Sequence, residues 1–377
     1  MRTTTDTVAT SHIGPLDGLR AAAIFLVLLY HLSPGRNPDL GLRSLHWKVA
    51  DIGWCGVDLF FVLSGFLITT KLIAARGDRH RFRNFYARRT LRIFPLYYAA
   101  LVVALIAVPL LTRLPFEPLH AQLPYWLYFT NFAWPELRVE QTVSISHFWS
   151  LAVEEQFYLL WPAVVFLTRE RITRWLCVAV AIAAPLLRLA LALNGAEWSA
   201  TYAWTPSRAD GLVLGSLLAF VYVSERFRRR ALPLSIAALL VTVAPLAWIT
   251  WRGKAHWVFT NSVTSEALLV RTLLPTVLAL FFAALLVCAL EVRPLGRILN
   301  GRAQSLIARY SYGMYVVHYM IFPALQKRLP DAAPLTVFLV GTAVSIAIAA
   351  VSYECFEKFF LSLKSRFPEG TRAEARS

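Results

Sequence analysis

Ten apolar segments, each about as long as a membrane helix, constrain this chain more than any other feature. About 17–25 predominantly apolar residues are needed for a helix to cross the hydrocarbon core of a bilayer. Of the 377 residues, 57% are hydrophobic and 16% are charged, against roughly 25% charged residues in a soluble domain. We therefore expect an all-α polytopic membrane protein. The predicted spanning helices are 16–35, 53–75, 93–112, 149–168, 175–193, 208–224, 231–251, 269–290, 306–325 and 335–356.

The basic residues predict which ends of these helices face the cytoplasm, because Lys and Arg concentrate in cytoplasmic loops. The link 76–92 holds seven arginines, and residues 225–230 read ERFRRR. Further basic links lie at 169–174 and 293–309. All of these links fall on one side if both termini are cytoplasmic, so we predict that topology.

The chain ends and the total charge add to this expectation. Residues 1–15 lack the apolar core of a signal peptide, so the first apolar segment is expected to remain as a span. Residues 361–377 are expected to form a disordered cytoplasmic tail after a transmembrane domain at 16–360. The net charge of +16 suits anionic lipid headgroups and does not require a nucleic-acid partner.

The segment 113–148 is not expected to form an eleventh span. The segment 113–148 contains an aromatic run at 123–135, but an eleventh span there would place the basic link 169–174 outside. We therefore interpret 113–148 as an outer-face or re-entrant element.

The four cysteines have no CxxC spacing, so neither a disulfide framework nor a metal site is expected. They are Cys55, Cys177, Cys288 and Cys355.

The first predicted helix carries ionisable side chains in an otherwise apolar segment. Arg20 and His31 are eleven residues apart, close to three helical turns, so both project from one face about 16 Å apart. Intramembrane ionisable groups usually face a protein interior or a wet cavity. One interpretation is a polar path from the cytoplasmic mouth into the bilayer. The other is that Asp17 and Arg20 pair at the helix end while His31 lies at the far interface.

Two more motifs contain charged residues that could take part in binding or catalysis. Arg89 and Arg92 share a helical face at the predicted cytoplasmic edge, where paired guanidinium groups suit phosphate recognition. They could equally serve as a topology anchor. Glu154 and Glu155 lie one to two turns into a predicted span, which is costly unless they face polar partners. Their side chains point about 100° apart, so only one need enter a cavity, and a structural glutamate that holds an arginine remains the alternative.

The polar residues of the other predicted helices also have two interpretations. Arg208 and Asp210 lie at the outer start of one helix, where local ion pairing would account for them. Ser311, Tyr315 and His318 share one face of another helix. That polar stripe suits a cavity wall, but hydrogen bonds between helices explain it equally well.

Taken together, the motifs resemble the integral-membrane acyltransferase family 3, from about Gly14 to Phe360. The segments that carry the resemblance are Arg20-x10-His31, GVDLFFVLSGFLI, FYARRTLRIFPLYY and HFWSLAVEEQFYLLWP. Members of this family O-acylate bacterial cell-surface polysaccharides and some secondary metabolites. The resemblance implies about ten spans around a polar cavity, an acyl-CoA donor (most often acetyl-CoA) and a sugar hydroxyl as acceptor. No outer-face hydrolase-like domain of the kind that some members carry is recognised, which leaves the need for a partner protein open.

By the same resemblance, Arg20 and His31 correspond to an essential pair and Arg89 and Arg92 to an Arg-x-x-Arg element, while Glu154 and Glu155 correspond to an acidic pair. We expect the donor phosphates at Arg89 and Arg92, the acyl-pantetheine arm past Arg20, and His31 as general base. Asp58 or one of the two glutamates would orient His31. The acceptor glycan would enter past outer polar and aromatic residues: His147, Trp149, Tyr158, Arg208, Asp210 and His318.

The expected function is thus a membrane O-acyltransferase that works without a metal. Direct transfer and a covalent acyl-histidine both remain open at this stage. A tailoring acyltransferase for a secondary metabolite and a transporter or flippase for a lipid-linked sugar are the alternatives. The sequence does not fix the acceptor, the acyl chain or the oligomeric state.

Overall fold

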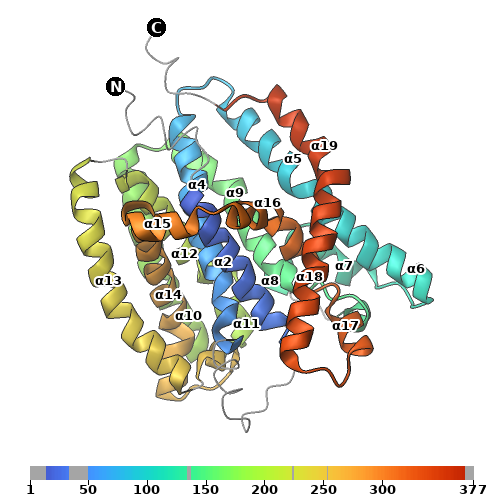
Figure 1. Ribbon diagram of the computed structural model, residues 1–377. Coiled ribbons are helices and arrows are strands. Elements are labelled where there is room, and N and C mark those ends of the chain that lie inside the picture. Colours follow the sequence, from blue (N-terminus) through green and yellow to red (C-terminus); the bar gives the residue numbers. More distant parts are fainter. Residues whose placement is uncertain (1–13, 34–49, 134–136, 223–224, 253, 370–377) are drawn as a thin grey trace.

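The computed structural model describes residues 14–33, 50–133, 137–222, 225–252 and 254–369, and its regular elements are helices throughout these ranges (Figure 1). The longer helices are α2 (Gly14–His31), α4 (Gly56–Ala74), α5 (Arg81–Val102), α9 (Trp149–Leu167), α10 (Glu170–Leu193), α12 (Thr205–Tyr222), α13 (Glu225–Trp251), α14 (Ser265–Glu291), α16 (Arg302–Val317) and α18 (Pro334–Ser352). Each predicted span coincides with one of these helices.

Short helices connect the long ones. They are α6 (Val108–Thr112), α7 (Leu119–Trp126), α8 (Thr130–Ala133), α11 (Trp198–Tyr202), α15 (Arg293–Leu299), α17 (Phe322–Arg328) and α19 (Lys358–Ser362). Single turns of 3₁₀ helix lie at Gly53–Cys55, Arg138–Gln141, Ser146–Phe148, Ala255–Phe259 and Leu363–Arg366, and π-helical turns at Val103–Ala107 and Tyr353–Glu357.

Seven helices within the described ranges are long and apolar enough to cross a membrane. The other three predicted spans correspond to α2, α12 and α16. These three are shorter than the seven, with 18, 18 and 16 residues, and each includes charged side chains. An all-helical fold with several candidate membrane spans is confirmed, whereas the count of ten spans and the cytoplasmic termini stay predictions.

Several predicted boundaries are wrong. Helix α5 begins at Arg81 rather than at residue 93, so the arginine-rich link is largely helical and continuous with the apolar segment. Helix α16 ends at Val317 rather than at 325. The first part of the predicted tail, 361–369, is described and includes the 3₁₀ turn Leu363–Arg366. The predictions for 1–13 and 370–377 lie outside the described residues.

The segment 113–148 does not form a continuous span. In its described part, the helices α7 and α8 have eight and four residues. About 17 residues are needed to cross, so the interpretation that this segment is not an eleventh span is confirmed. A re-entrant path for it stays a prediction.

Helices α2, α4 and α12 form the centre of the bundle, with α13 at one edge (Figure 1). In α4, 61% of the span is buried by neighbouring helices, against 17% in α13. Glycines allow the central helices to approach: a Cβ at Gly65 would lie 1.9 Å from the Leu212 carbonyl oxygen, and one at Gly215 would lie 2.1 Å from that of Val62. Small residues at such contacts are typical of membrane helix packing.

Candidate functional site

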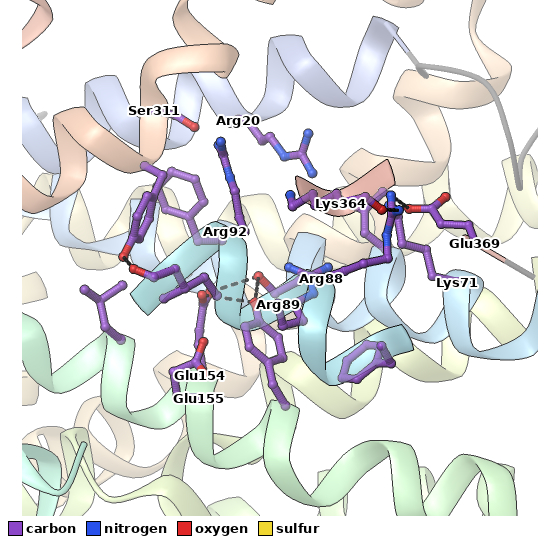
Figure 2. Close-up of a pocket in the computed structure, with 18 of the residues that line it drawn as sticks. Arg20, Lys71, Arg88, Arg89, Arg92, Glu154, Glu155, Ser311, Lys364 and Glu369 are labelled. Atoms are coloured by element: carbon purple, nitrogen blue, oxygen red, sulfur yellow. Dashed lines mark hydrogen bonds and ion pairs between the residues drawn. The ribbon is translucent and has the colours of Figure 1, made fainter. Parts of the chain in front are cut away.

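A cavity of about 410 Å³ opens where α4 ends and α5 begins, and it reaches inward between α2, α4, α5, α9 and α16. Basic side chains gather along its walls. They are Arg20, Lys71, Arg81, Arg88, Arg89, Arg92 and Lys364. Arg20 is separated from Arg89 and Arg92 by about 70 positions in the sequence, yet all three line this one cavity (Figure 2).

The predicted arginines are held on the cavity wall by aromatic rings and carboxylates. The Arg89 guanidinium lies 5.0 Å from the ring centre of Tyr158. That of Arg92 lies 5.8 Å from the ring of Tyr312 and 4.0 Å from the Glu357 carboxylate. Cation–π contact orients a guanidinium but leaves its in-plane N–H donors available. These donors suit an anion that enters the cavity.

Arg20 pairs with Asp17, as one of the two interpretations of this helix expected. Its Nη1 lies 3.3 Å from Asp17 Oδ1, one turn away on α2. The side chain of Arg20 is 37% exposed, whereas that of Asp17 is 6% exposed. Arg20 thus pairs with Asp17 and lines the cavity at the same time, so the two interpretations of this helix end are compatible.

The two glutamates lie across the cavity from Arg20, on α9 (Figure 2). Ser64 Oγ donates to Glu154 Oε1 at 2.9 Å, and the Tyr158 hydroxyl donates to Oε2 at 3.1 Å. Glu155 also lines the cavity. Both glutamates thus line the cavity, and which of them functions stays a prediction.

A strap formed by Leu363–Glu369 covers part of the basic wall. Arg88 donates to the carbonyl oxygens of Lys364 (3.1 Å) and Phe367 (2.8 Å) and to Glu369 Oε1 (2.7 Å). Lys71 Nζ lies 2.9 Å from the same carboxylate. Burial raises the pKa of Glu369, but Lys71 and Arg88 outweigh burial and hold that pKa below its usual value. Glu369 is therefore an anion seated among the cations of the cavity.

Three histidines cluster at the opposite end of α2. His31 Nδ1 lies 3.2 Å from His318 Nε2, and the ring centres of His147 and His318 are 4.9 Å apart. These histidines do not line the described cavity, which ends at Ser150 and Tyr315. The hydroxyls of Ser150 and Tyr315 are hydrogen-bonded to each other. The described cavity, which Arg20 lines, therefore does not reach His31 in this structure, and a continuous polar path between the two stays a prediction.

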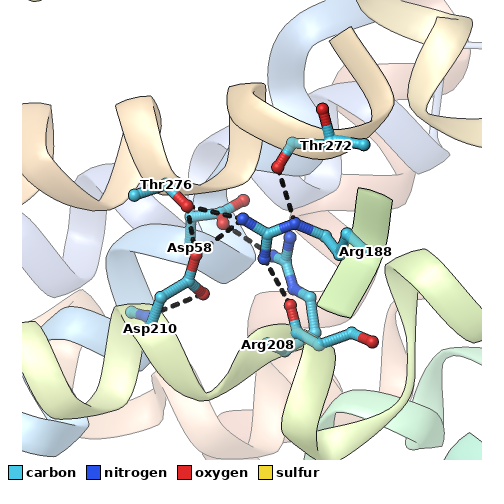
Figure 3. Close-up of polar contacts among 8 residues, drawn as sticks. Asp58, Arg188, Arg208, Asp210, Thr272 and Thr276 are labelled. Carbon is cyan, nitrogen blue, oxygen red and sulfur yellow. Dashed lines mark hydrogen bonds and ion pairs between the residues drawn. The ribbon is translucent and has the colours of Figure 1, made fainter. Parts of the chain in front are cut away.

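Asp58 does not orient His31. Its Oδ1 accepts a hydrogen bond from Arg208 Nη2 at 2.6 Å (Figure 3). The hydrogen bonds of His31 within the described chain go to the Val27 carbonyl, at 3.1 Å, and to His318. The glutamates line the cavity on the other side of Tyr315. Neither Asp58 nor these glutamates is hydrogen-bonded to His31, which corrects the sequence-based expectation of a carboxylate partner.

Arg208 and Asp210 do not form the local pair expected from their spacing. Each has a partner on another helix: Asp58 for Arg208, and Arg188 for Asp210 at 2.9 Å (Figure 3). All four side chains are at most 3% exposed. Since they point between α4, α10 and α12 and line no part of the described cavity, their geometry is that of a structural network.

The other acceptor candidates are distributed over the bundle. Tyr158 alone among the six lines the described cavity. The Trp149 ring packs 5.0 Å from that of Tyr202 and 6.3 Å from that of Phe61, measured between centres. His147 and His318 belong to the histidine cluster. An acceptor path past these residues stays a prediction.

Comparison with known proteins decides the family. Residues 13–354 match the family Acyl_transf_3, described as an acyltransferase domain. The chain belongs to acyltransferase family 3. The histidine cluster and most of the cavity wall lie within the matched residues, whereas Lys364, Pro368 and Glu369 of the cavity follow them.

Two relatives of this acyltransferase 3 chain are named as O-acetyltransferases. It is 29% identical over 376 residues to YrhL of Bacillus subtilis (strain 168), named as a candidate peptidoglycan O-acetyltransferase, with 92% of this chain and 54% of YrhL covered. It is 26% identical over 378 residues to the O-acetyltransferase OatA of Staphylococcus aureus, with 91% and 56% covered. The chain spans about half the length of these curated relatives. No solved structure matches it significantly.

Several residues of the acyltransferase 3 site escaped the sequence analysis. Lys71, Lys364 and Glu369 lie outside the motifs, whereas Arg88 lies inside FYARRTLRIFPLYY but was given no role. Their meeting depends on how the chain after α19 folds back onto α5. Arg188 carried a usable signal, because it is an isolated arginine in the apolar run of α10. A charge in that position must find a partner inside the bundle.

The buried pair gives the first testable expectation. Asp210→Ala leaves the Arg188 guanidinium buried without its carboxylate, which we expect to cost about 3–5 kcal/mol of unfolding free energy. Denaturation in mixed detergent measures this loss. Glu354→Ala is the control, since it removes an exposed pair with Lys358 that is worth about 1 kcal/mol or less. Equal stability of the two variants would contradict a structural role for Asp210.

Proposed function

We propose that this chain is a membrane O-acyltransferase that moves an acyl group, in the first instance acetyl, from acyl-CoA to a hydroxyl of a cell-surface or lipid-linked glycan. The observation that carries the proposal is the meeting of Arg20 with Arg89 and Arg92 on one cavity. Family membership supports the acyl-transfer chemistry. The donor and the acceptor are inferred as follows.

The cavity suits the phosphates of coenzyme A. That molecule carries a pyrophosphate and a ribose phosphate, and Arg and Lys are the residues that bind such groups through charge-assisted hydrogen bonds. Seven basic side chains line the cavity against four acidic ones, namely Asp78, Glu154, Glu155 and Glu369. A volume of about 410 Å³ also falls within the roughly 300–1,000 Å³ of small-molecule sites.

The position of the cavity favours a donor from the cytoplasm. Its basic mouth lies where α4 ends and the arginine-rich start of α5 begins, and arginine-rich links of this kind are cytoplasmic in membrane proteins. Arg20 and His31 stand about 16 Å apart along α2. An extended acyl-pantetheine arm is long enough to cover that distance once Tyr315 turns aside.

The proposed reaction uses His31 as general base. Its free ring nitrogen takes the proton of the acceptor hydroxyl while the hydroxyl oxygen bonds to the thioester carbonyl carbon. The carbon–sulfur bond then breaks, and the thiolate of coenzyme A leaves and takes up a proton. The products are an O-acyl ester and free coenzyme A.

A glycan acceptor is supported by the names of the relatives, since YrhL is named for peptidoglycan and OatA for O-acetyl transfer. The bacterial inner membrane is the compartment in which a cytoplasmic thioester and an outward-facing glycan come within reach of one protein. We therefore assign the chain to that membrane, with its termini in the cytoplasm.

The proposal is tested with purified protein in detergent and acetyl-CoA labelled in its acetyl group. We expect release of free coenzyme A that increases when a glycan fragment is added, with the label on the glycan. A protein that moves lipid-linked sugar across vesicles but releases no coenzyme A would be a flippase instead. Label found on a small-molecule hydroxyl, and never on a glycan, would indicate a tailoring enzyme.

The strap provides a separate expectation for donor affinity. Glu369 occupies Lys71 and Arg88, so donor phosphates must displace its carboxylate. Such half-exposed pairs are worth about 0.2–1 kcal/mol each, and Glu369→Gln should lower the Kd for acetyl-CoA by about two- to ten-fold. Glu354→Gln, which neutralises a carboxylate away from the cavity, should leave that Kd unchanged. Weaker donor binding by Glu369→Gln would mean that the strap supports the donor site instead of competing for it.

A further inference from the structure

The histidine cluster contains enough backbone contacts to assign the ring protons. His31 ends α2, His147 lies in the 3₁₀ turn Ser146–Phe148, and His318 directly follows α16. Each ring has a nitrogen that faces a backbone carbonyl oxygen. Since a carbonyl oxygen only accepts hydrogen bonds, the ring nitrogen that faces it must carry the proton.

This rule gives one consistent arrangement for His31 and His318. His318 Nδ1 lies 2.7 Å from the Tyr315 carbonyl oxygen, so Nδ1 carries the proton and the neutral ring has a lone pair on Nε2. That Nε2 lies 3.2 Å from His31 Nδ1. His31 Nδ1 also lies 3.1 Å from the Val27 carbonyl oxygen, so it carries a proton as well. The carbonyls of Tyr315 and Val27 thus independently indicate that His31 Nδ1 donates and His318 Nε2 accepts in the hydrogen bond between the two rings.

We propose that His318 is a positioning residue that holds His31 in its Nδ1–H form, so that Nε2 of His31 is the nitrogen that accepts the proton of the acceptor hydroxyl. The last clause rests on the proposed function, whereas the proton assignment does not. Within the described chain, the hydrogen bonds of His31 use Nδ1 alone, which leaves the lone pair of Nε2 unused.

The arrangement also stabilises the charged form of the base. When Nε2 of His31 takes a proton, the ring becomes a cation whose Nδ1–H remains donated to Val27 and to His318. His318 thus does what a carboxylate does in a Ser-His-Asp triad, which is to fix the tautomer and support the imidazolium. A neutral partner does so without placing a second charge in the bundle, where an unpaired charge is costly.

His147 supports the arrangement from the other side. Its Nε2 lies 3.0 Å from the Tyr315 carbonyl oxygen and 3.1 Å from that of Val316, so this nitrogen also carries a proton. The carbonyl oxygen of Tyr315 therefore accepts from both His147 and His318. This fixes the turn after α16 and, with it, the direction in which His318 faces His31.

Solid-state NMR of the full chain with ¹⁵N-labelled histidine tests the proton assignment without any turnover. The chain has eight histidines, and the His31 signals are identified as those lost in His31→Gln. We expect His31 with protonated Nδ1 and bare Nε2 in the neutral protein, and a mixture of both forms in His318→Leu. A wild-type His31 that carries its proton on Nε2 would overturn the inference, whatever reaction the protein catalyses.

Kinetics of coenzyme A release test the positioning role. His318→Leu removes the ring nitrogen that accepts the hydrogen bond from His31 and keeps a side chain of similar volume. We expect kcat to fall by about ten-fold or more, with the KM for acetyl-CoA unchanged. His318→Gln places an amide oxygen near the position of Nε2 and should recover most of this loss. His120→Gln, on the exposed face of α7, is the matched control with unchanged rates. Equal losses in the leucine and glutamine variants would reduce His318 to a packing residue.

Discussion

His31→Ala is expected to abolish acyl transfer while leaving the protein folded and inserted. The proposed reaction needs a base at the end of α2, and general-base catalysis contributes about 10²- to 10⁴-fold to a rate. Within the described chain, the His31 ring is hydrogen-bonded to Val27 and His318 and packs against the rings of Tyr30 and Tyr319. None of these partners is a charged group, so the loss of His31 should cost little stability. The release of coenzyme A from labelled acetyl-CoA measures the rate.

A binding measurement separates this outcome from a general loss of function. The His31→Ala protein should bind acetyl-CoA with unchanged Kd, because His31 does not line the basic cavity. Near-normal turnover in this variant would refute the base assignment. Loss of donor binding would show instead that the two ends of α2 are structurally dependent on each other.

The double variant Arg89→Ala with Arg92→Ala is expected to raise the Kd for acetyl-CoA by about 100-fold or more. Charge-assisted hydrogen bonds are worth about 1.5–3 kcal/mol each, and both guanidinium groups line the cavity. Because ionic interactions weaken as salt screens them, donor binding by the wild type should fall with ionic strength. The double variant should show a shallower dependence on salt. Isothermal titration at several salt concentrations measures both quantities.

The matched control removes two positive charges from the same predicted side of the membrane without touching the cavity. Arg79→Ala with Arg171→Ala serves this purpose, since both side chains are exposed. Donor affinity should stay within about two-fold of the wild type. Equal weakening in both double variants would indicate a general electrostatic attraction, and no change in either would leave Arg89 and Arg92 as topology signals alone.

The parts of the site that the sequence predicted are those governed by the periodicity of a single helix. The spacing of Arg20 and His31 placed them at two ends of one helical face, and the spacing of Arg89 and Arg92 placed both on one wall. Helical geometry repeats every 3.6 residues, so such relations can be calculated before any packing is known.

The parts that were missed depend on contacts between helices. Arg208 has Asp210 two positions away, yet it pairs with Asp58, 150 positions earlier. Buried charges pair with whichever partner packing brings close, and sequence distance carries little information about that choice. The histidine cluster joins three separate elements in the same way, so the spacing of His31 on α2 did not reveal its contact with His318.

The hydrogen bond between the hydroxyls of Ser150 and Tyr315 bears on the proton gradient across the membrane. A protein that lets a thioester from one compartment meet an alcohol from the other risks short-circuiting the proton gradient across its membrane. The basic cavity reaches the Ser150–Tyr315 contact and does not include the three imidazoles. In this conformation that cavity therefore gives protons no aqueous path to the histidines.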